Sequence, residues 1–251
     1  MCGSSPALGS EPVRCANLSG VSSDLLFVTH VAPYVDGPAG VHGVLDQAAV
    51  ALDQIAELDG LRARRVADVR DLDPGAVERA RALALFTIGE TPWTAAQRET
   101  ILTRVRAGDL ALVAIHSATD ACYGWSEYGA LVGARFDGHP WTQTVEIDVV
   151  DPDHPATTHL DARWRWHDEV YQFRDLRADA RILLQVPERE LDLGAAGAKH
   201  PAFGFPVSWC FTEGSGRVFS TSLGHFPGAW ETPSYLRHLT GGLAWALGEG
   251  T

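Results

Sequence analysis

The chain has 251 residues, of which 45% are hydrophobic and 21% are charged, and its formal net charge is −12. This composition is typical of a globular protein that buries a sizeable core. The acidic balance argues against nucleic acid or an anionic membrane surface as the main partner, because both attract clustered Lys and Arg, so we expect no nucleic-acid and no membrane partner but a neutral or cationic small molecule.

The first half of the chain alternates short apolar runs with helical patterns. Apolar runs predict parallel strands at residues 25–29, 82–88 and 110–115, and residues 64–69 also read as a strand. Between them, helices are predicted at residues 44–58, 74–80 and 95–107, the last with Thr94 as its N-cap and Gly108 as its stop. This alternation predicts an α/β fold, a three-layer αβα sandwich with a mostly parallel central sheet, whose ligand site lies at the carboxyl ends of the strands.

The second half has a different texture, with strands separated by turns. We predict strands at residues 146–150, 182–186, 206–211 and 217–221, some of them antiparallel, and a hairpin turn at residues 214–217. A last helix, at residues 233–247, carries leucines at intervals of three and four and should pack on the sheet. Since no linker is long enough to divide the chain, we predict a single domain over residues 23–251, preceded by a flexible tail at residues 1–22.

The four cysteines are far apart and form no C-x-x-C pair. They therefore predict neither a zinc ribbon nor a disulfide framework, and a reducing cytoplasm is the expected location. The Gly, Ser and Pro-rich tail lacks the basic start and the apolar run of a signal peptide. No stretch reaches the roughly 18 apolar residues of a membrane helix, which favours a soluble protein.

Polar residues stand at the ends of several predicted strands. His30, Glu90 and His116 each follow an apolar run, and His225 follows another. Carboxyl ends of neighbouring parallel strands meet at one edge of a sheet, so these four side chains are candidates to converge. Histidines with a carboxylate match either an acid/base site or a divalent metal such as zinc, although no H-x-x-x-H or H-E-x-x-H spacing supports the metal.

The segment at residues 114–118 reads A-I-H-S-A. Small residues around a polar one permit the tight turn of a nucleophile elbow, which would raise the His116 side chain above the sheet. The plainer interpretation is a histidine that is hydrogen-bonded at the end of a strand.

Aromatic residues gather at residues 119–141 and again near a pair of carboxylates, Asp168 and Glu169. The aromatic rings are either sugar platforms or the anchors on which a thick loop folds. The carboxylates are either a general acid or base or a helix N-terminal pair. As candidate substrate-binding residues we name His30, Glu90, Ser117, Tyr123, Trp125, His139 and Tyr171.

The sequence resembles the trehalose-utilisation (ThuA-like) family in an ordered set of blocks: A-I-H-S-A-T, G-A-R-F-D-G-H-P, D-H-P, D-E-V-Y-Q-F, G-R-V-F-S-T-S-L-G-H and L-A-W-A-L-G. The blocks cover nearly everything from His30 to Gly248. The resemblance implies a class I glutamine amidotransferase-like (flavodoxin-like) fold in which His116 replaces the nucleophilic cysteine, so glutamine hydrolysis through a thiolate is excluded. The chain departs from the family in Ala114, where the elbow usually begins with glycine, and in a shorter loop after Thr119.

The same resemblance implies a role in bacterial disaccharide utilisation, with sugars oxidised to the 3-keto form by a partner oxidoreductase. One hypothesis is an enzyme that isomerises, eliminates or hydrolyses a keto-sugar or glycoside by acid/base chemistry, with or without a metal. Its candidate catalytic residues are His116, His225, Glu169 and Asp168. The alternative is a non-catalytic sugar-binding or regulatory module on the same fold. A homodimer is the expected oligomer.

Overall fold

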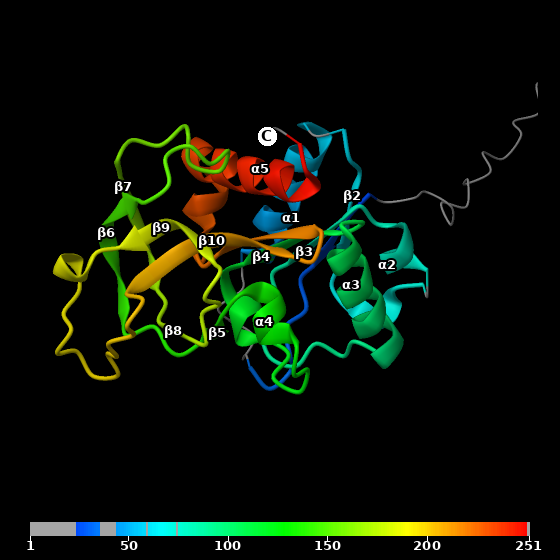
Figure 1. Ribbon diagram of the computed structural model, residues 1–251, viewed down its shortest axis with the longest axis horizontal. Coiled ribbons are helices and arrows are strands. Elements are labelled where there is room, and N and C mark those ends of the chain that lie inside the picture. Colours follow the sequence, from blue (N-terminus) through cyan, green and yellow to red (C-terminus); the bar gives the residue numbers. More distant parts are fainter. Residues whose placement is uncertain (1–23, 36–43, 59, 74, 250–251) are drawn as a thin grey trace, which may run out of the picture.

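The computed structural model describes residues 24–35, 44–58, 60–73 and 75–249. Within these residues a nine-stranded sheet has the order β2-β1-β3-β4-β11-β10-β9-β6-β7, and β5 pairs separately with β8 (Figure 1). The strands are β1 (Leu25–Val28), β2 (Ala63–Val66), β3 (Ala82–Leu85), β4 (Ala111–Ile115), β5 (Arg135–Phe136), β6 (Trp141–Val149), β7 (Arg163–Val170), β8 (Phe173–Arg174), β9 (Arg181–Val186), β10 (Phe205–Glu213) and β11 (Gly216–Thr221).

The strands β2, β1, β3, β4 and β11 are parallel. The side chains of β1, β3 and β4 are buried on both faces of the sheet, which explains the continuous apolar runs in their sequences, whereas the edge strand β2 exposes two arginines. In β1, for example, Leu25 and Phe27 belong to one core and Leu26 and Val28 to the other.

Helices cover both faces of the sheet. One core contains residues of α1 (Leu45–Leu58) and α5 (Pro233–Leu247), and the other contains residues of α2 (Ala76–Arg79), α3 (Ala95–Ala107) and α4 (Tyr128–Val132) (Figure 1). Helix α3 begins and ends as expected, with a capping box between Thr94 and Gln97 and a left-handed Gly108. The predicted three-layer sandwich with a mostly parallel centre is confirmed.

The remaining strands, β10, β9, β6 and β7, run antiparallel to their neighbours. Strand β6 begins at Trp141 and is longer than the predicted 146–150, and β7 was not predicted. In β7, Asp168 pairs with Gln143 and Glu169 with Thr142 of β6. The two carboxylates therefore lie in a strand, and the helix N-terminal interpretation of this pair is wrong.

Short 3-10 helices complete the described chain: η1 (Val69–Asp71), η2 (His116–Asp120), η3 (Glu188–Glu190) and η4 (Pro227–Glu231). The predicted strand 64–69 ends earlier, at Val66, because the chain turns into η1, which Asp68 caps. The aromatic segment 119–141 is not one loop, since it forms the end of η2, α4, β5 and the first residue of β6. The predicted tail at residues 1–22 lies outside the described residues. Among the described helices, none has the length and apolarity that crossing a membrane requires.

Candidate functional site

The turn after β4 is strained at His116. Its φ is +50°, a left-handed conformation that costs a non-glycine residue roughly 1–2 kcal/mol. The residue begins η2, and its side chain is fully buried. The tight turn predicted from the small neighbouring residues is therefore present, and it carries a histidine.

One hydrogen bond fixes the tautomer of His116. The Nδ1 atom lies 2.7 Å from the carbonyl oxygen of Ser222. A carbonyl oxygen only accepts, so Nδ1 carries the proton and donates it. When the ring is neutral, its Nε2 atom therefore presents a lone pair.

Three side chains meet this Nε2 atom, and with His116 we call them the histidine cluster: His116, Glu169, Tyr171 and His225. The Tyr171 hydroxyl is 3.0 Å and His225 Nδ1 is 3.1 Å from His116 Nε2. The Glu169 Oε2 atom lies 3.6 Å from His116 Nε2 and 3.2 Å from His225 Nδ1. The chain brings the four together from the ends of β4, β7 and β11.

Burial perturbs the titratable groups of the cluster. It raises the pKa of Glu169 to about 7, helped by the charge of Asp168 and opposed by a hydrogen bond from Tyr171. Burial and the neighbouring Glu169 charge also raise the pKa of Tyr171 well above its usual value. The Tyr171 hydroxyl therefore keeps its proton at neutral pH and remains a donor.

Asp168 faces backbone and indole N–H groups instead of the lone pairs of the cluster. It accepts hydrogen bonds from Trp166 Nε1 at 3.0 Å and from the backbone N–H groups of Glu169 at 3.0 Å, Gly224 at 2.8 Å and His225 at 3.2 Å. Burial raises the pKa of Asp168 to about 6 although these bonds favour the carboxylate. The carboxylate ties the loop that carries His225 to the end of β7.

His139 lies on the exposed side of the cluster. Its Nδ1 atom is 3.6 Å from Glu169 Oε1, and its ring stacks on Tyr171 with centroids 5.7 Å apart. The side chain of His139 is 42% exposed, that of His225 15% and that of Glu169 9%. A small molecule would therefore reach the cluster from the side of His139 and His225.

Three aromatic rings outside the predicted site residues surround the histidines. Phe86 meets the His116 ring edge to face at 5.5 Å, Trp230 stacks on Phe86 at 5.9 Å, and Phe226 lies 4.7 Å from the His225 ring. Their positions in the sequence could have indicated them, since Phe86 lies in the predicted strand 82–88 and Phe226 and Trp230 follow His225 closely.

The expected convergence of four strand-end groups is only half correct. His116 and His225 meet, but His30 faces Asp68 and Arg70 of the neighbouring segment, and burial lowers its pKa. The Glu90 carboxylate accepts a hydrogen bond from the backbone N–H of Gly124 at 2.9 Å. The carboxylate that joins the two histidines is Glu169, which the sequence pattern did not link to them.

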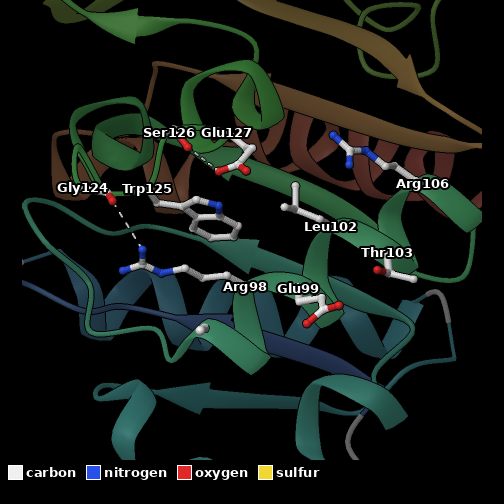
Figure 2. Close-up of a pocket in the computed structure, with 10 residues that line it drawn as sticks. Arg98, Glu99, Leu102, Thr103, Arg106, Gly124, Trp125, Ser126 and Glu127 are labelled. Atoms are coloured by element: carbon white, nitrogen blue, oxygen red, sulfur yellow. Dashed lines mark hydrogen bonds between the residues drawn. The ribbon is translucent and has the colours of Figure 1, made fainter.

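The candidate aromatic residues before α4 have other neighbours. Trp125 is buried beneath the Arg98 guanidinium, 5.6 Å from the ring centre, and lines a pocket between α3 and residues 124–127 to which no member of the histidine cluster contributes (Figure 2). Tyr123 is exposed and donates to Asp120 at 2.5 Å. Ser117 is buried next to His116 in η2.

The sheet order, the two helical layers and the strained strand-to-helix turn define a protein of the class I glutamine amidotransferase-like, flavodoxin-like fold, with histidine at the elbow. The family model described as trehalose utilisation (ThuA) matches residues 34–246. The chain belongs to this family.

Solved structures show the same fold. A ThuA-like protein from Bacteroides uniformis is 18% identical with a TM-score of 0.71, over 94% of this chain and 95% of that one. One from Parabacteroides merdae is 19% identical with a TM-score of 0.68, over 92% of each chain. The chain is also similar to part of a β-galactosidase from Bacillus circulans, with 12% identity and a TM-score of 0.54, over 91% of this chain and 31% of that one. No curated protein matches the chain significantly.

Proposed function

We propose that this protein is an enzyme of carbohydrate metabolism that catalyses the isomerisation, hydrolysis or an elimination reaction of a keto-sugar or keto-glycoside. The observation that carries the proposal is the convergence of His116 Nε2, His225 Nδ1 and a Glu169 oxygen at the strained turn of His116. The partly exposed side chains of His139 and His225 leave this cluster accessible from solvent. Membership of the trehalose-utilisation family supports a carbohydrate as substrate. We do not propose glutamine hydrolysis, because histidine stands at the elbow and burial raises the pKa of the nearby Cys122 thiol.

The proposed reaction begins at a C–H bond next to a carbonyl group. A base removes this proton, and the electron pair forms an enolate whose negative oxygen needs a partner. In the cluster without a bound cation, His116 Nε2 is the base, because its lone pair points toward the other members. The Tyr171 hydroxyl donates to the enolate oxygen.

The enolate then has two outcomes. Reprotonation at another carbon gives an isomer. Alternatively, the electron pair of the enolate expels the glycosidic oxygen, which takes a proton from His225 or Glu169. Addition of water to the resulting carbon–carbon double bond then completes a net hydrolysis. We assign Asp168 the role of a positioning residue, since it holds the loop of His225, and His139 that of a substrate contact.

The remaining sequence-based assignments stay proposals. His30, Glu90, Ser117, Tyr123 and Trp125 are candidate substrate contacts outside the cluster. The carbonyl of the substrate has to arise by oxidation of a sugar hydroxyl, so we propose a functional link to a sugar oxidoreductase. Cys122 and Cys210 are free thiols, which supports a reducing cytoplasm. The homodimer also stays a prediction.

The test is turnover of 3-keto-trehalose or a 3-keto-glucoside in D₂O. We expect the substrate to disappear and deuterium to enter the carbon next to the carbonyl. His116→Asn should abolish both, because asparagine tolerates the left-handed turn but supplies no base. The exposed His200→Ala is the matched control. Unchanged substrate over hours, with and without divalent metals, would refute the proposal, and sugar binding without turnover would favour a non-catalytic module.

A further inference from the structure

We infer that the histidine cluster binds a divalent transition metal such as zinc, held by His116 Nε2, His225 Nδ1 and Glu169 Oε2. These three atoms are the one group of potential ligand atoms within the described residues that all lie within 4.8 Å of one another. The role of the metal rests on the proposed function, since the ion would supply the positive partner of an enolate oxygen. Metal binding itself is tested independently of turnover.

The spacing of the three atoms matches a small tetrahedral ion. Zinc bonds to nitrogen and oxygen are about 2.0–2.2 Å long, so two ligands of a tetrahedral ion lie roughly 3.3–3.5 Å apart. The distances in the cluster are 3.1 Å between the two nitrogens and 3.2 and 3.6 Å from these nitrogens to Glu169 Oε2. An ion would therefore fit with shifts of a few tenths of an ångström.

The surroundings orient the ligands in the way that metal sites require. His116 donates Nδ1–H to the Ser222 carbonyl, and metal-bound histidines regularly use their second nitrogen in this way. Asp168 holds the backbone of Gly224 and His225, which fixes the position of the second histidine. Both imidazoles are thus held with their ligand atoms toward the same point.

The ligand types favour a transition metal and leave a coordination position open. Two imidazoles suit zinc, nickel, copper or iron better than calcium or magnesium, which prefer oxygen. Three protein ligands plus one further position is the arrangement of catalytic zinc sites. The Tyr171 hydroxyl, 3.0 Å from His116 Nε2, and the partly exposed side of His225 border that position.

A bound metal would revise the roles proposed above. The lone pairs of His116, His225 and Glu169 would be occupied, and the ion would hold the carbonyl oxygen of the substrate. Proton transfer would then pass to His139, which is partly exposed and lies 3.6 Å from Glu169 Oε1.

The experiment is zinc titration of the full, EDTA-treated chain by calorimetry, with cobalt as a spectroscopic probe. We expect one tight site and the intense visible bands of four-coordinate cobalt. Glu169→Gln and His225→Ala should each weaken binding about 100-fold or more, because even outer-shell partners contribute 10–100-fold. His200→Ala should bind as the wild type does, and circular dichroism checks that each variant is folded.

The outcomes separate this inference from the proposed function. No binding, or binding that folded Glu169→Gln and His225→Ala variants retain, overturns the metal site. If the metal-free chain also turns over a keto-sugar at the full rate, the enzyme assignment survives and the metal is refuted. Tight zinc binding at this site without turnover supports the metal and counts against the proposed reaction.

Discussion

The Asp168 carboxylate joins strand β7 to the loop at residues 224–225 through four N–H donors, and a change of this side chain should therefore disturb both segments. Asparagine has one acceptor oxygen, so Asp168→Asn would point an amide N–H₂ group at two of the donors. We expect a loss of about 2–4 kcal/mol in the free energy of unfolding, measured with urea, because buried donors are left unsatisfied.

The same variant should loosen His225. Zinc affinity should therefore fall about 10–100-fold, as it does when outer-shell partners of metal ligands are removed. Asp161→Asn, at an exposed position, is the control for the change of charge. Unchanged stability together with unchanged affinity would show that Asp168 does not position the loop.

The left-handed backbone at His116 makes a second prediction at the residue scale. Asparagine adopts a φ of +50° more readily than β-branched residues do, so His116→Val should be less stable than His116→Asn by about 1–3 kcal/mol. Urea unfolding of the two variants measures the difference. Equal stabilities would mean that the turn relaxes, and that the strain is not imposed by the surrounding fold.

Sequence reasoning found the histidines of the site but not their carboxylate. His116 and His225 follow β4 and β11, which are hydrogen-bonded parallel neighbours. The carboxyl ends of neighbouring parallel strands lie side by side, so this pair could be predicted without knowing the rest of the sheet. Glu169 reaches them from β7, four places beyond β11 in the sheet order. No pattern in the sequence predicts that the end of β7 comes close to the ends of β4 and β11.

At the element scale, α5 depends on two glycines in its middle. A Cβ atom on Gly241 would lie 2.2 Å from the Pro155 carbonyl oxygen and 2.7 Å from the Ala156 nitrogen, both backbone atoms. Alanine normally stabilises a helix interior by about 1 kcal/mol over glycine. Here the clash outweighs that gain, so Gly241→Ala should destabilise the protein by about 1–3 kcal/mol.

The matched control is Gly228→Ala in η4, where a Cβ atom would meet nothing within 4 Å. Thermal unfolding of both variants decides the matter, and a stabilised Gly241→Ala variant would show that α5 does not pack this closely on residues 155–156.

Helix α5 also carries a buried histidine with a pH-dependent effect on stability. His238 Nδ1 donates to the Ala156 carbonyl at 2.8 Å, and burial lowers the pKa of His238 to about 3. The folded pKa is below the unfolded value of about 6.5, so this contribution to stability is complete above pH 6.5 and is lost as the pH falls toward 3.

His238→Asn removes this titration and keeps an N–H donor. Between pH 6 and 4, wild-type stability should therefore fall more steeply than that of the variant, by up to about 1.4 kcal/mol per pH unit. Because His154 and His159 titrate in both proteins, the comparison isolates His238. Parallel pH profiles would contradict the prediction.

Strand β7 was missed although its signal was present. Its residues alternate between exposed and buried from Arg163 to Asp168, which is the period of a half-buried strand. The charged and aromatic composition obscured that period. Helix α3, by contrast, was found because its capping box and left-handed glycine are encoded within a few residues.

At the scale of the whole molecule, the cluster joins the two halves of the sheet. His116 and His225 follow strands of the parallel half, and Glu169 belongs to the antiparallel half, whose Trp166 stacks on Tyr235 of α5 with ring centres 5.5 Å apart. Alternating strands and helices predicted the parallel half correctly. The order of the antiparallel half depends on these long-range packing contacts, which periodicity along the chain does not encode.

This arrangement predicts where a bound metal would protect the backbone. Local opening of the edge hairpin β6–β7 separates Glu169 from the two histidines, so it breaks the metal site, whereas opening of β2 at the other edge does not. With zinc at 100 times its dissociation constant, hydrogen exchange at residues 163–171 should slow by up to about 100-fold, and exchange at residues 63–66 by less. The effect should disappear in Glu169→Gln. Equal slowing at both edges would mean that zinc stabilises the protein from a different site. Only a ligand bound by Glu169 together with His116 and His225 connects the β6–β7 hairpin to the ends of β4 and β11.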